Sequence, residues 1–511
     1  MNNTTPNAED NPSSVETEES LNHVMQARRD KLQRIQELGI NPYPYSFAKS
    51  HSIEEIFNDF EALQTSEAVV KVAGRIASIR LMGKAAFVHI QEEAEKIQLY
   101  FKRDIIGEES WELFKLLDIG DILGLEGTPF RTRTDERTIK VASFTLQAKN
   151  LRPLPAVKEK DGVVWFAWTD KEERYRNRAM DLLINPAARN ILLNRSLIVR
   201  EIRQFLDGED FLEVETPILQ PIYGGAAARP FVTHHNSLDQ NFYLRIADEL
   251  YLKRLIAGGF PRVYEISKDF RNEGIDRMHS PEFTMMECYA AWEDYNYVAD
   301  LIERMIVRIA SKILPQPEIT FADKVISLKA PFKRATMSDL LKEACGVEII
   351  ARKRDDLAAE AKGLGIAIDK SWGVGKIIDE IFSQTVEPNL IDPTFVMDYP
   401  IELSPLAKRH RSVDGLVERF ELFIGGMEVA NAFSELNNPI DQRERFEEQT
   451  RLISEGDDEA HPIDENYLQS LELGMPPTGG LGMGVDRIVM LLTGASSLRD
   501  VILFPTLRNR E

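Results

Sequence analysis

An arginine between two apolar segments is the first residue of this chain whose surroundings suggest chemistry. Arg271 follows residues 262–266, which are predicted as a strand, and the polar residues after it include His279. A second apolar run begins at Phe283, so the pattern predicts a strand, a charged loop and a second strand. A guanidinium stays charged and offers a planar fork of donors that fits phosphate or carboxylate. The stretch therefore predicts an anion site, although Arg271 alone would suit a solvated surface hairpin.

Two further stretches have unusual residue patterns. Residues 479–484 read GGLGMG and are predicted as a glycine-rich turn that leads into an apolar helix, with Arg487 in its first turns. Glycines allow close approach of the backbone to a ligand, and this spacing matches neither the dinucleotide fingerprint nor a phosphate loop ending in Gly-Lys-Ser/Thr. Residues 210–219, DFLEVETPIL, are predicted as a helix end that passes into a strand ending at Pro217.

In sequence order, these stretches resemble motifs one, two and three of class II aminoacyl-tRNA synthetases, with Pro217, Arg271 and Arg487 as their marker residues. The segments between them narrow the resemblance to the bacterial-type class II lysyl-tRNA synthetases: GGAAARPFVTHHN at 224–236, ELYLKRL at 249–255 and MEVANAFSELNNP at 427–439. The resemblance covers nearly the whole chain from about residue 21.

The resemblance implies an ATP-dependent ligase. Such an enzyme activates L-lysine with ATP to form lysyl-adenylate and pyrophosphate, and then transfers lysine to the 3′ end of tRNA(Lys). It also implies Mg2+ as a cofactor and a homodimer built through motif one, with Pro217 near the two-fold axis.

The resemblance assigns roles in catalysis and ATP binding to several residues. Arg271 would bridge the α-phosphate of ATP and the carboxylate of the amino acid, and Arg271 and Arg487 are the catalytic candidates. Phe283 would stack on one face of the adenine, with Arg487 on the other. Glu421 and Glu428, seven residues apart, match the magnesium ligands, since magnesium is commonly held by a few carboxylates and substrate phosphates. The predicted ATP-binding residues are Arg271, Glu273, His279, Phe283, Glu428, Gly484 and Arg487.

Three glutamates in apolar or aromatic surroundings bear on the choice of amino acid: Glu249, Glu287 and Glu435. An unpaired buried carboxylate is costly, and a cationic substrate would remove that cost. Any one of them alone would be expected to pair with a lysine or arginine of the chain. By resemblance, Glu435 and Tyr289 would bind the ε-ammonium of lysine, and Glu249 with the Gly225 carbonyl its α-ammonium. The predicted lysine-binding residues are Gly225, Glu249, Arg271, Glu287, Tyr289, Asn431, Phe433 and Glu435.

These sites require more than one folded part, and the chain is predicted to be an α+β protein. Residues 1–20 are polar and acidic and are predicted as a disordered tail, followed by a helical segment at 21–65. Residues 151–179 are predicted as a linker that contains the sequence VVWFAW at 163–168. The catalytic domain, 180–511, is expected to be an antiparallel sheet flanked by helices, with a helical insertion at about 298–390.

Residues 66–150 are predicted as a small barrel. They contain five short segments with strand patterns, at 69–80, 85–91, 96–101, 121–127 and 138–144, and an oligonucleotide-binding (OB) fold is the common case for such a pattern. By resemblance this module binds the anticodon, where aromatic rings stack on bases and polar side chains read base edges. Phe87 has a second interpretation as a barrel-core residue. The candidate anticodon contacts are Arg80, Phe87, Gln98 and Glu136.

Composition sets wider bounds. No apolar run approaches the roughly 20 residues that a membrane-spanning helix needs, and the first residues do not read as a signal peptide. Cys288 and Cys345 lie far apart and without partners at metal-binding spacing, which predicts a cytoplasmic protein without a zinc site. The net charge of −21 opposes non-specific binding of nucleic acid, so basic patches on an acidic body are expected.

Three positions depart from the family pattern. Asp135 and Asp210 stand where a glycine is usual, and Ser280 stands where an asparagine is usual. A bend that needs a positive φ would be strained by aspartate, although aspartate tolerates that region better than most residues.

Other functions remain possible from the sequence alone. An aspartyl or asparaginyl relative should need a cation for the substrate side chain, which the three glutamates disfavour. A lysyl-transferase paralogue that acts on a protein would lack the barrel. A non-catalytic tRNA-binding protein on a synthetase body is disfavoured because Arg271, Phe283, Glu428 and Arg487 are all present.

Overall fold

The computed structural model describes residues 18–155, 157–160, 163–166, 168, 170–370, 372–454 and 462–510. The tail predicted at 1–20 therefore lies outside the described residues up to residue 17. The chain divides into two compact units, one of Met1–Asp170 with Leu183–Pro186 and one of Lys171–Leu182 with Ala187–Glu511. Each unit has its own hydrophobic core, and each is described by itself.

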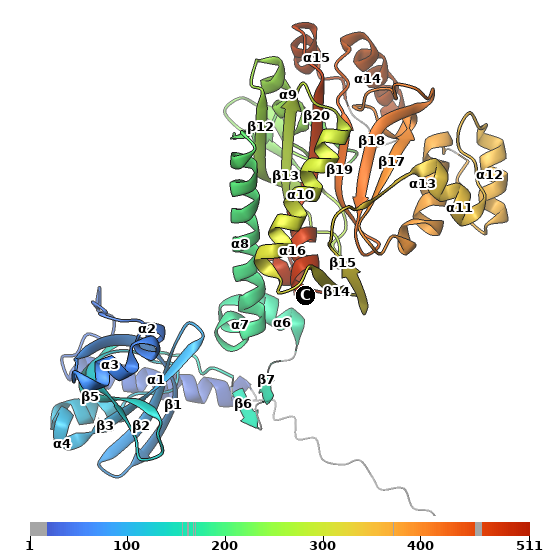
Figure 1. Ribbon diagram of the computed structural model, residues 1–511. Helices are drawn as coiled ribbons and strands as arrows, with labels where there is room; N and C mark the ends of the chain where they lie inside the picture. Colours follow the sequence, from blue (N-terminus) through green and yellow to red (C-terminus); the bar gives the residue numbers. More distant parts are fainter. Residues whose placement is uncertain are drawn as a thin grey trace, which may run out of the picture. The chain divides into compact units, whose positions relative to one another are not determined.

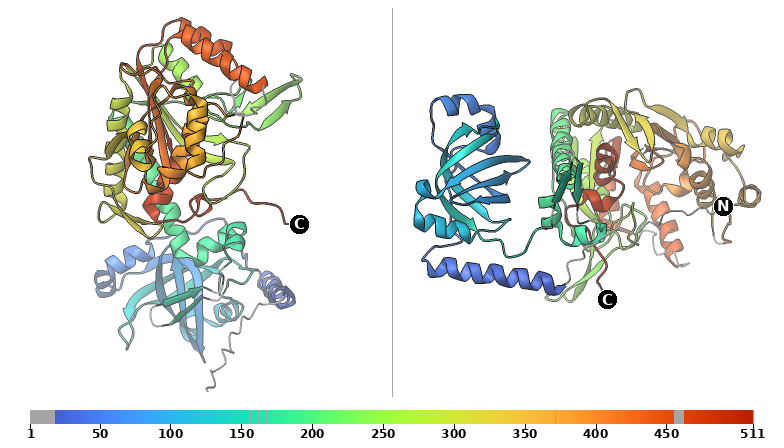
Figure 2. Two further views of the ribbon diagram at one scale, coloured as in Figure 1. Left: turned by 90° about the vertical axis from the view of Figure 1, so that its right-hand side faces the viewer. Right: turned by 90° about the horizontal axis from the view of Figure 1, so that it is seen from below.

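The first unit is built on a closed five-stranded barrel, which confirms the predicted fold (Figure 1 and Figure 2). The strands follow the order β1-β2-β3-β5-β4, and β4 pairs back onto β1. Buried and outward side chains alternate along them, as in β2, where Ala86, Val88 and Ile90 are fully buried. The strands are β1 (Val70–Met82), β2 (Ala85–Glu92), β3 (Glu95–Lys102), β4 (Ile122–Arg131) and β5 (Arg137–Ala148).

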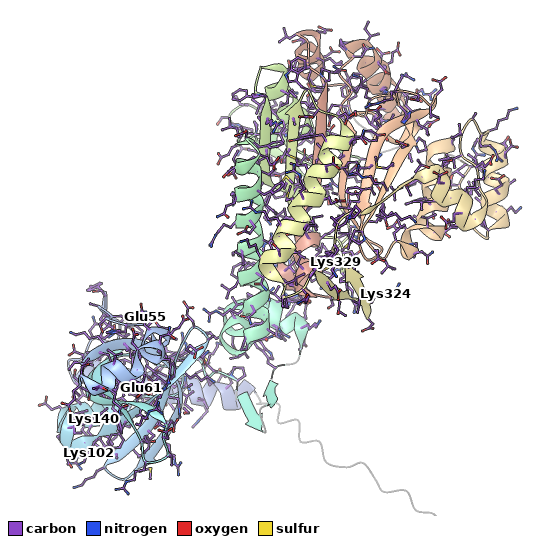
Figure 3. The ribbon with its side chains drawn as sticks, in the orientation of Figure 1. Glu55, Glu61, Lys102, Lys140, Lys324 and Lys329 are labelled. Atoms are coloured by element: carbon purple, nitrogen blue, oxygen red, sulfur yellow. The ribbon has the colours of Figure 1, made fainter. Side chains whose placement is uncertain are left out.

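Helices pack on the barrel. In α1 (Glu18–Glu37), Ile35 is fully buried in the barrel core and Lys31 Nζ lies 2.6 Å from Asp118 Oδ1. The barrel surface carries both signs of charge: Figure 3 marks Glu55 and Glu61 on two short helices, and Lys102 and Lys140 on β3 and β5. The remaining helices are α2 (Ile53–Asn58), α3 (Phe60–Thr65), α4 (Arg103–Ile106) and α5 (Glu108–Lys115).

The predicted linker contains regular structure. Its strands β6 (Val157–Lys160) and β7 (Val163–Phe166) form an antiparallel hairpin, and β7 covers the first four residues of VVWFAW. Two short helices follow, α6 (Lys171–Arg176) and α7 (Arg178–Ile184).

The second unit contains an eight-stranded sheet in the order β16-β17-β18-β19-β20-β13-β12-β8 (Figure 1). The six central strands pair antiparallel, as predicted, whereas the two edge strands pair parallel to their neighbours. The strands are β8 (Leu212–Glu213), β12 (Arg262–Phe270), β13 (Glu282–Ala291), β16 (Lys333–Thr336), β17 (Thr394–Pro400), β18 (Leu416–Phe423), β19 (Glu428–Ser434) and β20 (Thr478–Gly484).

The two faces of this sheet have different surroundings. Because successive side chains of a strand point to opposite faces, Met286 and Cys288 of β13 enter the large core with α8 (Pro186–Gly208), α10 (Tyr295–Ile313) and α16 (Val485–Thr493). Glu287 and Tyr289 point to the other face, where Tyr289 packs in a smaller apolar cluster. The helices of that cluster are α9 (Glu249–Ala257), α14 (Pro439–Ser454) and α15 (Glu465–Glu472). This second face is left partly open for a ligand.

The segment predicted as a helical insertion, about 298–390, is helical in its second half and more varied in its first. It begins inside α10, which packs against the sheet, and continues into a hairpin of β14 (Glu318–Phe321) and β15 (Lys324–Ser327). Figure 3 marks Lys324, the first residue of β15, and Lys329, which follows the strand. Strand β16 then joins the edge of the main sheet. The helices that follow are α11 (Met337–Cys345), α12 (Arg354–Gly363) and α13 (Val374–Thr385), with a 3₁₀ turn at Glu387–Asn389.

The glycine-rich stretch 479–484 was predicted as a turn, and that prediction is wrong. It forms most of β20, a central strand paired with both β13 and β19. The glycines are needed for space: a Cβ on Gly480 would overlap the Glu435 carboxylate and the Tyr289 ring. The prediction failed because glycine in general weakens a strand. Here the glycines are explained only by the close approach of side chains from neighbouring strands, which the sequence does not show.

Two of the departures from the family pattern coincide with left-handed backbone. Asp135 and Asp210 both have φ of 63°, in the region where glycine is favoured. Asp210 lies between α8 and β8, and Asp135 in the turn between β4 and β5. The aspartates thus keep bends that a glycine would allow without strain.

Candidate active site

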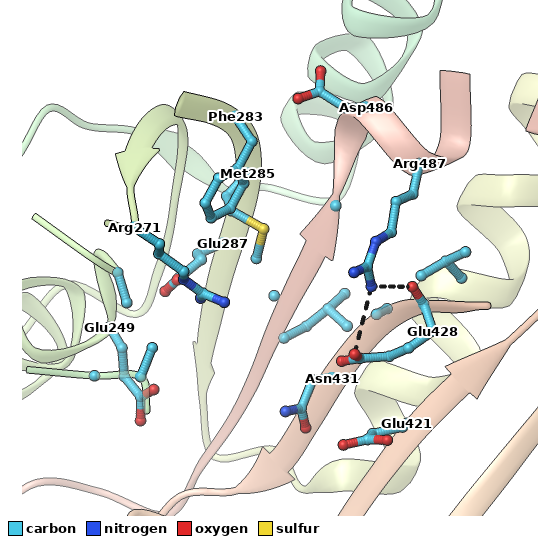
Figure 4. A pocket seen from close by; sticks show the side chains of 18 of the residues that line it. Glu249, Arg271, Phe283, Met285, Glu287, Glu421, Glu428, Asn431, Asp486 and Arg487 are labelled. Atoms are coloured by element: carbon cyan, nitrogen blue, oxygen red, sulfur yellow. Dashed lines mark hydrogen bonds and ion pairs between the residues drawn. The ribbon is translucent and has the colours of Figure 1, made fainter. Parts of the chain in front are cut away.

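A cavity of about 360 Å³ lies over the central strands β13, β19 and β20 (Figure 4). Its size is within the range of small-molecule sites, about 300–1,000 Å³. Among its lining residues are fourteen of the predicted site residues, which are Gly225, Glu249, Arg271, Glu273, His279, Phe283, Glu287, Tyr289, Glu421, Glu428, Asn431, Phe433, Gly484 and Arg487.

Arg271 lies where β12 ends and the loop to β13 begins. Its backbone N–H donates to the Pro281 carbonyl at 3.0 Å, which closes the mouth of the hairpin. The guanidinium carbon lies 5.1 Å from the centre of the Phe283 ring, and Nε donates to the Ile246 carbonyl at 3.4 Å. Within the described part of the chain, no carboxylate forms an ion pair with Arg271, so its Nη atoms are available to an anion in the cavity.

Arg487 approaches the cavity from the first turn of α16, on the side opposite Arg271 (Figure 4). Its Nη1 donates to the Glu428 carbonyl at 2.6 Å and lies 3.5 Å from Glu428 Oε2. The preceding residue, Asp486, fixes the start of the helix: it accepts from the Thr284 N–H at 2.9 Å and pairs with Arg195 of α8 at 2.5 Å. Two guanidinium groups therefore reach one cavity from separate, anchored elements.

Glu421 and Glu428 come from the adjacent strands β18 and β19 and both line the cavity. Glu421 accepts from the Tyr399 hydroxyl at 2.9 Å and pairs with Arg419 at 2.5 Å. Burial, and then the charge of Glu428, raise the pKa of Glu421 to about 7 even with Arg419 beside it. Two neighbouring carboxylates on adjacent strands offer hard oxygen donors, so this pair fits a divalent cation such as magnesium even though each also lies beside an arginine.

Glu249, Glu287 and Tyr289 form an acidic corner of the cavity. The Tyr289 hydroxyl donates to Glu287 Oε2 at 2.9 Å, and the Asp248 N–H donates to Glu287 Oε1 at 3.4 Å. Burial, followed by the charges of Asp248, Asp269 and Glu249, raises the pKa of Glu287 well above its usual range. This carboxyl therefore favours its neutral form more than an exposed glutamate does.

A buried polar cluster supports this corner from behind. Asp248, Asp269 and Glu287 each place a carboxylate oxygen within 4.8 Å of the others. Arg245 pairs with Asp248 at 2.9 Å and with Glu265 at 2.8 Å. Because Asp248 directly precedes α9, this pairing ties the start of that helix, and with it Glu249, to β12.

Glu435 is the one predicted site residue of the catalytic unit that does not line the cavity. It follows β19, is 1% exposed, and forms an ion pair with the fully buried Lys253, which also pairs with Glu249. This is the internal pairing that the sequence had left open. Burial raises the pKa of Glu435 to about 8, against the lowering effect of Lys253. Its carboxylate lies directly against Gly480 and Tyr289, which do line the cavity, so it is one layer behind the wall.

The other predicted residues occupy the rim and walls. Glu273 and His279 lie exposed in the loop after β12, where His279 Nδ1 is 2.9 Å from Asp276 Oδ2. Asn431 accepts from Arg419 Nε at 3.1 Å, and Gly225 has a φ of 92° where its chain segment passes Ala247. Ser280, the third departure from the family pattern, also lines the cavity.

The predicted anticodon residues lie in the first unit. Arg80 and Phe87 are cross-strand partners on β1 and β2, and Phe87 is half-buried and absent from the barrel core, which removes the core interpretation. The Phe87 ring centre lies 5.2 Å from that of Tyr100. Gln98 accepts from the Thr138 hydroxyl at 2.9 Å, and Glu136 is 3.1 Å from His89 Nε2. Phe87, Gln98 and Glu136 are therefore grouped around His89: Phe87 precedes it by two residues on β2, Glu136 contacts it, and Gln98 is its cross-strand partner. Of these three side chains, Gln98 is buried, with 8% exposure.

Some residues of the site were not predicted from the sequence. Lys253 follows Glu249 by four residues on a helix, a spacing that brings side chains together and was available as a signal. Its contact with Glu435, 182 residues later, had no such signal. Arg419 faces Glu421 two residues along the same strand, β18. It contacts Asn431 because β18 and β19 are neighbours, and this contact required the fold.

Two parts of the chain match known protein families. Residues 170–508 match the family described as tRNA synthetases class II (D, K and N), and residues 70–154 match the OB-fold nucleic acid binding domain. A lysine–tRNA ligase of Carboxydothermus hydrogenoformans is 51% identical over 96% of this chain and 99% of its own length. One of Pelotomaculum thermopropionicum is 50% identical over 97% of this chain and 96% of its own.

Membrane insertion has no support among the helices. Over the described ranges, none is both long and apolar enough to span a bilayer. With a cavity that two arginines enter on an antiparallel sheet, an OB barrel, and relatives that align over almost their whole length, the chain belongs to the class II tRNA synthetases of the D, K and N group.

Proposed function

We propose that this chain is a lysine–tRNA ligase that activates L-lysine with ATP and transfers it to tRNA(Lys). The curated lysine–tRNA ligases that are about half identical over nearly the full length support the reaction. The observation that carries the choice of lysine is a group of buried glutamates: Glu249 and Glu287 at one corner of the cavity, and Glu435 directly behind it. A negatively charged corner stabilises a cationic substrate side chain and disfavours aspartate or asparagine.

Activation brings two anions together, because the lysine carboxylate attacks the α-phosphorus of ATP and pyrophosphate leaves. Arg271, with free Nη atoms in the cavity, is proposed to hold the α-phosphate and the lysine carboxylate and to stabilise the charge that develops between them. Phe283 under its guanidinium is proposed to stack on the adenine, with Arg487 on the opposite side near the terminal phosphates. Glu273 and His279 on the exposed loop are proposed to contact the nucleotide at the rim.

Lysine is proposed to lie with its carboxylate toward Arg271 and Asn431 and its two ammonium groups toward the glutamates. Glu249 and the Gly225 carbonyl would take the α-ammonium, and Glu435 with Tyr289 the ε-ammonium. Glu435 Oε1 supports this, since it is buried and has no hydrogen-bond partner among the described residues. A buried acceptor without a donor is costly, and an ammonium would supply the donor.

Magnesium is the proposed cofactor, held by Glu421 and Glu428 together with the phosphates of ATP. When bound, it would neutralise phosphate charge and orient the triphosphate. Glu421 and Glu428 would hold the magnesium ion at the adjacent strands β18 and β19.

The barrel is proposed to select the tRNA. Phe87 offers a half-buried ring for stacking, and Arg80, Gln98 and Glu136 offer polar groups nearby. After activation, the 3′-hydroxyl of the terminal adenosine attacks the carbonyl of lysyl-adenylate, and AMP leaves.

A homodimer and a cytoplasmic location complete the proposal. Leu212, Ile218 and Leu219 are exposed apolar side chains around Pro217, which suits an interface between two copies. Sedimentation equilibrium of the purified protein tests this, with twice the chain mass expected. Cys288 and Cys345 form no disulfide, in keeping with the cytoplasm, where tRNA charging takes place.

Aminoacylation of unfractionated tRNA tests the whole proposal. Purified protein with ATP and magnesium should attach labelled lysine, but neither aspartate nor asparagine, to acid-precipitable tRNA. Attachment of aspartate or asparagine would keep the family and overturn the assignment of the glutamates. Failure to charge any tRNA, with folded protein, would favour a binding protein built on a synthetase body.

A further inference from the structure

Lys253 is a buried charged residue to which the proposed reaction assigns no role. Helix α9 carries it one turn after Glu249, and its side chain is fully buried. Its ammonium forms ion pairs with Glu249 and with Glu435. Nζ lies 5.5 Å from the ring centre of Phe433 and 6.0 Å from that of Tyr289, and both rings line the cavity. Lys253 is therefore located one layer behind the acidic corner.

The charges of this group do not balance. When both glutamates are ionised, the single positive charge of Lys253 compensates only one of their two negative charges. Glu249 lines the cavity, and Glu435 Oε1 has no hydrogen-bond partner in the described chain. Glu435 also lies against Gly480 of the cavity wall. The arrangement fits one fixed cation and one cation that arrives with the ligand.

The fixed cation determines whether the glutamates can be charged. Two buried carboxylates that share a site do not both ionise at neutral pH unless a cation compensates them. Burial raises the pKa of Glu435 to about 8, Lys253 lowers it, and Glu249 raises it. Without Lys253 the carboxyls would hold protons to still higher pH, and a neutral carboxylic acid attracts an ammonium only weakly.

We propose that Lys253 is a positioning residue for substrate recognition: its ammonium holds Glu249 and Glu435 in place as ionised receptors for the ammonium groups of lysine. This inference rests on the proposed lysine–tRNA ligase function. The groups that face Glu435 are Lys253 and Glu249 of α9, Tyr289 of β13 and Tyr467 of α15. Lys253 is the only cation among these four side chains, and Glu249 is also influenced by the charge of Arg419 on β18.

The test compares Lys253→Met with Lys253→Arg in lysine-dependent exchange of pyrophosphate into ATP, between pH 6.5 and 9. In Lys253→Met the KM for lysine should rise at least about tenfold at pH 7, and its pH dependence should shift upward by about one unit or more. The KM for ATP and kcat at saturating lysine should stay close to those of the wild type. Lys253→Arg keeps the charge and should restore most of the lysine affinity and the original pH dependence.

Several results would overturn the proposal. An unchanged lysine KM and pH profile in Lys253→Met would do so, and so would a parallel loss of kcat and of both substrate affinities without a pH shift. If the methionine variant does not fold, Lys253→Gln replaces it, because glutamine keeps hydrogen-bond donors without the charge. Absence of lysine-dependent exchange in the wild type would instead overturn the proposed function.

Discussion

Arg271 has a fixed backbone position and a guanidinium group without an ion-pair partner among the described residues. Its backbone is held at the hairpin mouth by Pro281, whereas its guanidinium makes one hydrogen bond at 3.4 Å and a contact with the Phe283 ring. A side chain held in this way adds little to the stability of the fold. It is preorganised for an anion, which is the property that lowers a barrier when charge develops.

Replacement of Arg271 should therefore damage the rate and spare the fold. We expect Arg271→Ala to lower kcat for lysine-dependent exchange by about 100-fold or more, as for loss of a charge-stabilising donor. Arg271→Lys keeps the positive charge but lacks the planar pair of donors, so its kcat should lie between those of the wild type and Arg271→Ala. Thermal unfolding is the control, and a fall in melting temperature that parallels the loss of activity would contradict the assignment.

Glu435, directly behind the acidic corner, should make lysine binding depend on pH. The pKa of Glu435 is raised from its ordinary value to about 8, mainly by burial, so below pH 8 the carboxyl is increasingly neutral. Recognition of an ammonium requires the ionised form, so the KM for lysine should fall as pH rises from 6 to 8, by up to about tenfold per unit. The KM for ATP, measured in the same exchange assay, should lack this trend. Glu435→Gln should show a high lysine KM without the pH dependence.

At the scale of elements, the site depends on one face of a sheet. Strand β13 sends Met286 and Cys288 into the core and Glu287 and Tyr289 toward the cavity, and β20 beside it supplies glycines where those side chains need room. Gly480 is the clearest case, because a Cβ there would meet both Glu435 and Tyr289.

Gly480→Ala should therefore disturb lysine binding. The added methyl group must displace the Glu435 carboxylate or the Tyr289 ring, and we expect a rise in the KM for lysine together with a loss of stability of about 1–3 kcal/mol. Urea unfolding and exchange kinetics measure the two effects. Gly208→Ala is a matched control, since nothing lies within 4 Å of a Cβ at that position. Equal effects of the two substitutions would argue against the packing explanation.

The sequence predicted these elements unevenly, for physical reasons. The barrel strands were recognisable because side chains such as Val88 and Ile90 alternate with outward residues. The strand–loop–strand around Arg271 was recognisable from two apolar runs separated by a polar loop. The glycine strand β20 was not, since its residues lack strand preference and are chosen for the space they leave. The Lys253–Glu435 pair required the whole fold, because no local pattern links α9 to the end of β19.

For the whole molecule, the two proposed binding sites belong to different compact units. The cavity lies entirely within the second unit, and the predicted anticodon residues lie entirely within the first. Activation of lysine should therefore be separable from recognition of the tRNA. The negative net charge of −21 also fits recognition through particular surfaces rather than through general attraction of nucleic acid.

Phe87→Ala tests this division. Loss of one stacking ring should raise the KM for tRNA(Lys) in aminoacylation by about 5- to 150-fold, the equivalent of about 1–3 kcal/mol per stacked base. Lysine-dependent exchange, which needs no tRNA, should remain at the wild-type rate in the same variant. A loss of exchange activity would show that the barrel substitution acts through stability or through the catalytic unit.

The cavity is proposed to activate lysine because the buried glutamates in and behind its wall select a cationic side chain. The most direct measurement is exchange of labelled pyrophosphate into ATP by the purified protein, with lysine, ornithine, aspartate and asparagine supplied one at a time. Exchange is expected with lysine, strongly reduced exchange with the shorter ornithine, and none with aspartate or asparagine. Exchange driven by aspartate or asparagine, or by none of the four with folded protein, would contradict this proposal.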